Sequence, residues 1–300
     1  MKVIIPDAIT DAVITSTNIS EDDYAEWDVA ATYAVADRVI ILATHRIYES
    51  LIAANTGNDP TLEDQESPIN WLDVSATNRW KPFDQIVTSQ AVNAGLIEYE
   101  FTTTNIVNSV AFFGVEAETI QVIATSASDG VVYDKTITMQ NNSAVYDWFT
   151  WFFEPIVNRS KAVFHGLPNY FDAVITVKVA VSSGDAKVGQ IVLGRVRRIG
   201  ETEFGTTVGF RDYSTKKTNI YGDQIIVKRR YANVVDFDIA IRTSDAEMVN
   251  EFLAGYRTDR LVWIGSSDIN HGVLVYGYYR DTAILLESPS ISRVNIHVED

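Results

Sequence analysis

The residues of this chain whose types and spacing could bind a ligand are aromatic and lie near its start. Five large rings, those of Trp27, Tyr33, Tyr48, Trp71 and Trp80, fall within the first 85 residues. Aromatic faces are flat, rigid and apolar, which suits them to stacking on the C–H faces of sugar rings. The spacing therefore predicts non-covalent saccharide binding by these five residues. The alternative is that the same rings form the core of a small β module, where large aromatics dominate packing.

Catalytic side chains in a recognisable arrangement are missing from the sequence. The four histidines, His45, His165, His271 and His297, have no metal-ligand spacing, and there is no cysteine to supply a thiolate or a zinc site. No nucleophile elbow, phosphate loop or dinucleotide fingerprint occurs. We therefore expect no catalytic residue, no metal and no cofactor.

Carboxylates leave two weaker possibilities open. The acid and nucleophile of a glycoside hydrolase are paired in space, so Glu98, Glu100, Asp147 and Glu154 are nominal candidates. Asp59, Glu63, Asp64 and Glu66 place four carboxylates in one loop, as a calcium site would need, but without an ordered ligand pattern. The alternative for both sets is a solvated acidic surface.

The elements that must position these side chains are predicted to be strands. Apolar and polar residues alternate over 97–101, 175–181 and 235–241, a period of two that indicates half-buried antiparallel strands. Asp129-Gly130 predicts a tight hairpin. One helix is expected over about 244–254, with Ser244 and Glu247 as a capping box and an apolar stripe from Met248 to Leu253.

A second dense aromatic cluster falls in the middle of the chain. We interpret this cluster as core or inter-sheet packing. It consists of Trp148-Phe149 and, after Thr150, Trp151-Phe152-Phe153. The alternative is an exposed patch that docks a partner or a glycan.

Length and charge suggest three β-rich modules. We predict an aromatic-rich module at 1–85, an antiparallel β-sandwich at 86–204 and a β-rich domain with the one helix at 205–300. Acidic and basic residues number 15 and 5 in the first segment, 12 and 8 in the second and 13 and 11 in the third, giving −10, −4 and −2 of the total of −16. Such a charge disfavours nucleic acid and anionic lipid as partners. Two basic clusters, Arg195/Arg197/Arg198 and Lys228-Arg229-Arg230, are interpreted as solvated strand faces or subunit contacts.

The first module resembles the small chitin-binding modules of bacterial chitinases. The resemblance rests on an initial Trp, a following Tyr, a Gly-Asp-x-Val turn, a second Tyr and a Trp after a Gly-x-x-Pro-like loop. The matching positions are Trp27, Tyr33, Asp37 with Val39, Tyr48, Gly57 with Pro60, and Trp71, and the departure is Ala36 in place of glycine.

The whole chain resembles minor tail proteins of long-tailed bacteriophages. This resemblance is carried by Asn78-Arg79-Trp80 with Phe83-Asp84, the Gly205-to-Gly222 segment with Asp212 to Lys216, Leu261 to Gly265, and Val275 to Asp281. It implies a structural component of the tail tip that binds host-surface saccharide, with other tail-tip proteins and copies of itself as partners. It also implies a location in the virion, after assembly in bacterial cytoplasm, which fits the lack of cysteine, of an export signal and of a membrane-inserting run. The rivals are a polysaccharide-degrading tail enzyme and a free-standing bacterial carbohydrate-binding protein.

Overall fold

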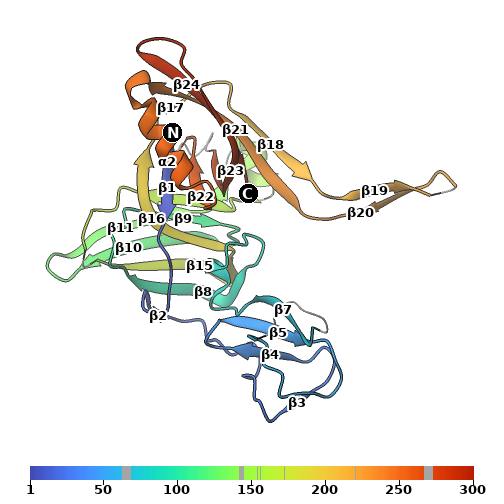
Figure 1. Cartoon of the computed structure of the whole chain (residues 1–300). Coiled ribbons are helices and arrows are strands. Elements are labelled where there is room, and N and C mark those ends of the chain that lie inside the picture. The colour runs from blue at the N-terminus through green and yellow to red at the C-terminus, as the bar shows by residue number, and fades with distance from the viewer. Residues whose placement is uncertain are drawn as a thin grey trace. The chain divides into compact units, whose positions relative to one another are not determined.

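The computed structural model describes residues 1–62, 69–141, 145–153, 155, 157–171, 173–219, 221–266 and 273–300. Strands dominate these residues, so the expected mainly β fold class is confirmed (Figure 1). The chain forms two compact units that interleave along the sequence. The terminal unit comprises Met1–Asp7, Val107–Ser109 and Leu193–Asp300, and the central unit comprises Ala8–Ile106 and Val110–Val192. The module boundaries at 85/86 and 204/205 stay a prediction.

The terminal unit is built on an antiparallel sheet in which the first strand of the chain lies between two later ones. Strand β1 pairs on one side with β16 and on the other with β22. The order continues through β23, β24 and β21, and both β17 and β18 pair with β21. The bounds are β1 (Lys2–Pro6), β16 (Gln190–Arg198, its first three residues in the central unit), β17 (Glu201–Thr202), β18 (Thr207–Asp212), β21 (Tyr231–Arg242), β22 (Leu261–Ile264), β23 (Leu274–Leu285) and β24 (Ile291–Glu299).

One apolar face of this sheet forms the core of the terminal unit. The predicted alternation over 235–241 is confirmed, since Val235, Phe237, Ile239 and Ile241 are buried while the residues between them are partly exposed. They pack with the fully buried Trp263 in one cluster. Period-two patterning therefore determines which face of β21 is covered.

The longer of the two α-helices among the described residues covers this core. Helix α2 (Ala246–Gly255) buries Val249, Phe252 and Leu253, and the Tyr279 hydroxyl donates a hydrogen bond of 2.6 Å to the Leu253 carbonyl. The expected Ser244–Glu247 capping box is wrong. Residues Thr243–Asp245 form a 3-10 turn, η2, and the Ser244 hydroxyl donates to Asp245 at 3.0 Å. Because this turn occupies the extended N-cap position that a capping box needs, the α-helix begins later, at Ala246.

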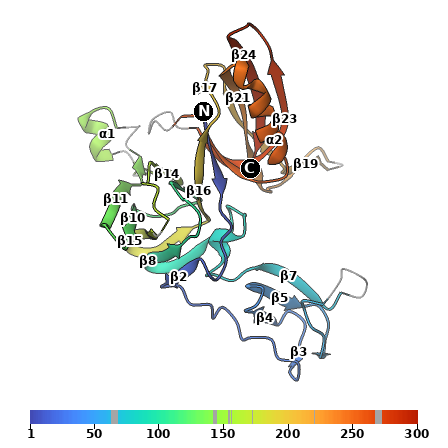
Figure 2. The ribbon, with the colours of Figure 1, turned by 60° about the vertical axis from the view of Figure 1, so that its left-hand side comes forward.

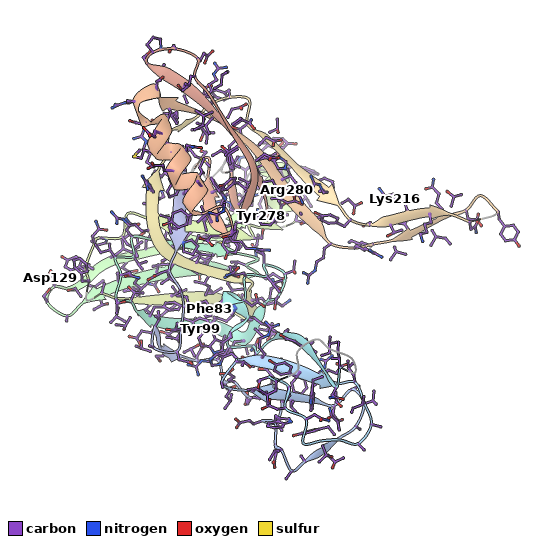
Figure 3. The ribbon with its side chains drawn as sticks, viewed as in Figure 1. Phe83, Tyr99, Asp129, Lys216, Tyr278 and Arg280 are labelled. Carbon is purple, nitrogen blue, oxygen red and sulfur yellow. The ribbon has the colours of Figure 1, made fainter. Side chains whose placement is uncertain are left out.

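A two-stranded ribbon, here called the arm, extends from β18 and β21 (Figure 1). Strands β19 (Thr215–Thr218) and β20 (Gln224–Val227) pair only with each other, and Lys216 lies on this ribbon (Figure 3). Ile225, Ile226 and Val227 are 52%, 61% and 50% exposed, so both faces of β20 carry uncovered apolar side chains. An isolated two-stranded ribbon is marginally stable in water, and exposed aliphatic residues add to that instability.

The base of the arm is anchored on one buried carboxylate. Glu299 at the end of β24 is 2% exposed and accepts hydrogen bonds from Arg211 Nη1 at 3.1 and 3.0 Å and from the Tyr213 hydroxyl at 2.5 Å. Arg280 Nε of β23 lies 2.7 Å from the second oxygen, and the Arg280 side chain lies near the start of the arm (Figure 3). Hydrogen bonding to Glu299 is the main cause that raises the pKa of Tyr213.

Removing the Glu299 charge should loosen the arm base. Glu299→Gln is expected to lower the free energy of unfolding by about 2–3 kcal/mol, because charge-assisted hydrogen bonds from two guanidinium groups and a phenol are lost at a buried site. Urea unfolding measures this. The control is Glu287→Gln, which removes a half-exposed ion pair with Arg293 and should change stability by less than about 1 kcal/mol. Equal effects of the two variants would contradict the anchoring role.

The central unit contains a five-stranded antiparallel sheet in the order β11-β10-β15-β8-β2. Its buried faces are those predicted from alternation, with Ile97, Tyr99 and Phe101 on β8 and Ile175 and Val177 on β15. The Asp129-Gly130 hairpin is confirmed, with Gly130 at φ 74° (Figure 3 labels Asp129). The bounds are β2 (Ile14–Thr17), β8 (Ala91–Thr102), β10 (Thr119–Ser126), β11 (Gly130–Thr138) and β15 (Val174–Val188). The sandwich arrangement stays a prediction.

The remaining elements are short. The described residues between 32 and 76 form two small sheets, a pair β3-β6 and a three-stranded sheet β4-β5-β7. Their bounds are β3 (Thr32–Tyr33), β4 (Arg38–Ile41), β5 (Arg46–Ser50), β6 (Asn55–Thr56) and β7 (Trp71–Ala76). The others are η1 (Lys81–Phe83), β9 (Ser109–Phe113, with Ser109 in the terminal unit), β12 (Gln140–Asn141), α1 (Trp148–Phe153), β13 (Val157–Asn158) and β14 (Lys161–His165).

An aromatic cluster packs η1 against β8 within the central unit. The Phe83 ring meets Tyr99 edge-on at 5.4 Å between centroids and Phe101 at 5.9 Å (Figure 3). The Tyr99 hydroxyl donates to the Arg79 carbonyl at 2.6 Å. The segment that follows the small sheets is thereby fixed to the five-stranded sheet.

Candidate functional site

Three of the five rings predicted to bind sugar are buried. Tyr48, Trp71 and Trp80 are 8%, 4% and 8% exposed. Tyr48 and Trp71 form a small core with Val39, and Trp71 Nε1 donates to the Asn58 carbonyl at 2.9 Å. These three rings fit the alternative that the aromatics form the core of a small β module, because a covered ring face cannot stack on a ligand.

Trp80 is covered by a histidine. Its ring stacks on that of His45, with centroids 4.1 Å apart and planes 19° from parallel. His45 Nδ1 lies 2.9 Å from Glu21 and Nε2 lies 3.0 Å from Asp11, so both ring nitrogens are occupied by carboxylates. This arrangement fastens the β4–β5 turn to the preceding segment and leaves neither nitrogen free for proton transfer to a substrate.

Trp27 and Tyr33 are the two predicted residues that stay partly exposed. Both pack against the small core, Tyr33 by an edge-on contact with Trp71 at 5.2 Å. The Tyr33 hydroxyl accepts a hydrogen bond of 2.7 Å from the Asp28 amide. The prediction of sugar binding therefore continues to apply to Trp27 and Tyr33, which present part of their surface to solvent.

A groove lies beside Tyr33 on the same small sheets. It is open, has a volume of about 610 Å³ and is lined in part by Tyr24, Tyr33, Asp37, Arg38 and Glu49. Tyr24 is an exposed aromatic that the sequence analysis did not single out. The sequence feature that could have indicated Tyr24 as a site residue is its position in an acidic stretch, three residues before Trp27.

The turn before Asp37 contains a residue with a left-handed backbone conformation. Ala36, which stands where the chitin-binding pattern has glycine, adopts φ 69°. The Asp37 amide donates to the Ala34 carbonyl at 3.2 Å, and an Asp37 carboxylate oxygen accepts from the Ala34 amide at 2.7 Å. The turn therefore forms without glycine, with the strain that a Cβ introduces in this region.

The middle aromatic cluster is exposed, so its interpretation as core is wrong. Helix α1 presents Trp148, Phe149, Trp151, Phe152 and Phe153 at 63–79% exposure, and only its Thr150 is buried. The backbone of this helix is labelled in Figure 2. Asp147 caps the helix by accepting a hydrogen bond from the Thr150 amide at 2.7 Å, which is the main cause that lowers the Asp147 pKa. The helix turns its rings outward because local capping and not an apolar partner defines it.

Three of the carboxylates considered for hydrolysis or calcium, Glu98, Asp147 and Asp59, have structural partners. Glu98 pairs with Lys178 at 3.1 Å, and Asp59 accepts hydrogen bonds from the Thr61 amide and hydroxyl at 2.8 Å. Glu63, Asp64, Glu66, Glu154 and His271 lie outside the described residues. Within the described ranges, no three metal-ligating side chains are grouped to hold an ion. No helix in this part of the chain has the length and apolarity that a membrane span requires.

The basic clusters differ in their surroundings. Arg195 and Arg198 are exposed on β16, while the Arg197 guanidinium lies 4.6 Å from the centroid of the Phe252 ring. Lys228-Arg229-Arg230 is exposed and joins β20 of the arm to β21.

Comparisons with known proteins found no matching family model, no similar curated protein and no similar solved structure.

The contrast between buried and exposed tryptophans gives a direct test. Trp71→Ala should lower the free energy of unfolding by about 3–5 kcal/mol, because it empties the centre of a small core. Trp151→Ser should change it by no more than about 0.5 kcal/mol, since an exposed ring contributes little to folding. Urea unfolding compares the two. A large loss for Trp151→Ser would mean that α1 is covered in the folded protein.

A second test addresses the Ala36 turn. Ala36→Gly should leave stability unchanged or raise it by up to about 1 kcal/mol, because relief of left-handed strain offsets the added entropy of the unfolded chain. Ala34→Gly, two residues earlier where φ is not positive, should lower stability by about 0.5–1 kcal/mol. Thermal unfolding distinguishes them. Equal losses for both variants would show that Ala36 is not strained.

Proposed function

We propose that this chain is a structural and adhesive component of a long-tailed phage tail tip. In this proposal it assembles with copies of itself and neighbouring tail proteins, and its first module binds a host-surface saccharide. The observation that carries the proposal is the arm, because the exposed aliphatic side chains of β20 need a covering surface that the described part of the chain does not supply. A protein that works alone gains nothing from such a ribbon, whereas an assembling subunit uses it to bind its neighbour.

Charge supports a second copy as the surface that covers the arm. Residues 211–230 carry six basic and two acidic side chains, a net +4, so the rest of the chain carries −20. Lys216 and Lys217 lie on β19 opposite the exposed Ile226 and Ile225. Arg211 and Lys228-Arg229-Arg230 lie where the arm joins β18 and β21. An acidic surface on another subunit would attract this arm, and copies of this chain provide one.

Assembly also gives weak saccharide binding a use. Sugar contacts made by one or two aromatic rings are individually weak, so adhesion requires several modules held together. A subunit that multimerises through one region and binds sugar through another meets that need. The proposal therefore assigns binding without chemistry to this protein.

The arm can be tested by charge reversal in the full chain. Light scattering at low salt should show that the wild-type protein self-associates. The Lys216→Glu/Lys217→Glu variant should have a dissociation constant for self-association at least tenfold higher. The matched control Lys135→Glu/Arg242→Glu reverses two exposed basic residues outside the arm and should associate as the wild type does. Wild-type protein that stays monomeric at every concentration would contradict arm-mediated assembly.

The rival functions have separate outcomes. Labelled antibody should find the chain at the tail tip of purified virions, and its absence from them would favour a free-standing carbohydrate-binding protein. Release of reducing ends from capsule or lipopolysaccharide by purified protein would favour the polysaccharide-degrading enzyme.

A further inference from the structure

The groove beside Tyr33 is the place where the small sheets combine an exposed ring with fixed polar groups. Strand pairing creates it, because the β4–β5 register places Arg38 directly opposite Glu49. Tyr24 reaches this pair from the segment before β3. Residues 24, 38 and 49 thus meet through tertiary structure alone.

Arg38 is held in place but remains available to a ligand. Its Nε and Nη2 lie 2.8 Å from Glu49 Oε2, and its Nη1 donates to the Tyr24 hydroxyl at 3.2 Å. The hydrogen bond to Tyr24 is the main cause that raises the Arg38 pKa, so the guanidinium is charged throughout the physiological range. A guanidinium has five N–H donors, and these contacts use three. Because the side chain is 41% exposed, the remaining donors face solvent in the groove.

Tyr24 supplies the apolar surface. Its side chain is 39% exposed, and the Arg38 carbon Cζ lies 5.9 Å from the ring centroid, so contact with Arg38 limits the movement of the ring. The site therefore combines a pre-positioned aromatic face, the fixed guanidinium donors of Arg38 and two carboxylates, Asp37 and Glu49. These groups are complementary to a ligand ring that has C–H faces and hydroxyl groups at its edges. Saccharides have both features.

The net charge of the site limits the class of saccharide that it can bind. Asp37 and Glu49 outweigh Arg38 by one negative charge, and residues 1–85 carry −10. Anionic sugars such as uronates, and phosphate-bearing polymers, would be repelled at this surface. Neutral sugars are unaffected by this field, and sugars with an amino group are attracted.

We propose that the Tyr24–Arg38–Glu49 groove binds neutral or amino-bearing saccharides and rejects anionic ones. This inference rests on the adhesive part of the proposed function and names its site and ligand class. Tyr24 provides the stacking face, Arg38 donates to sugar hydroxyls, and Glu49 holds Arg38 while accepting from hydroxyl or ammonium groups.

The test is calorimetric titration of the full chain with cellohexaose, a glucosamine hexamer and polygalacturonate. Wild-type protein should bind at least one of the first two, and bind polygalacturonate at least tenfold more weakly. Tyr24→Ala should weaken binding at least tenfold, while Tyr146→Ala, which removes an exposed tyrosine elsewhere in the central unit, should leave it unchanged. Arg38→Lys keeps the positive charge but loses the fork, and should also weaken binding. Thermal unfolding confirms that each variant is folded.

Three outcomes would overturn the inference: wild-type protein that binds none of the three saccharides, preference for polygalacturonate, or unchanged binding by folded Tyr24→Ala and Arg38→Lys. Each is independent of the light-scattering result for the arm. A chain that assembles but fails here loses the groove proposal alone, and a chain that binds here but stays monomeric loses the assembly proposal alone.

Discussion

The buried Glu299 carboxylate is the interaction on which the form of the terminal unit depends. It accepts hydrogen bonds from Arg211 and Tyr213 at the arm base and contacts Arg280 on the neighbouring strand. A carboxylate 2% exposed would be costly without such partners, and with them it joins the arm to the sheet. The same contacts hold the base of the arm, whose two strands are marginally stable by themselves, so that the arm extends away from the core.

Exposed apolar surface is distributed unevenly over the described residues. Most large side chains of the sheets are covered, while the rings of α1 and the aliphatic side chains of β20 are not. Surface of this kind is unfavourable in a solitary soluble chain and is retained where another molecule covers it. Together with the opposite charges of the arm and the remaining chain, it is the basis of the assembly proposed above.

The first small sheets separate the packed rings from the proposed ligand site. Tyr48 and Trp71 lie inside, and Trp80 is stacked on His45. Arg38 and Glu49 lie on the other side of their strands, because alternation turns them away from Val39 and Tyr48. A minimal aromatic core thus suffices to hold a rigid polar site.

The sequence by itself determined the strands, because a period of two records which face of a β-strand meets the core, as in 97–101 and 235–241. It also predicted a helix over about 244–254, which the structure has at Ala246–Gly255, and the turn at 129–130. Only tertiary structure decided which aromatic rings are covered. Trp71 and Trp151 are the same residue type, so their apolarity alone does not distinguish the buried ring from the exposed one. It also brought Tyr24, Arg38 and Glu49 together and formed the 3-10 turn that replaced the capping box at Ser244. Burial and pairing between distant residues depend on register and packing, which local patterns do not encode.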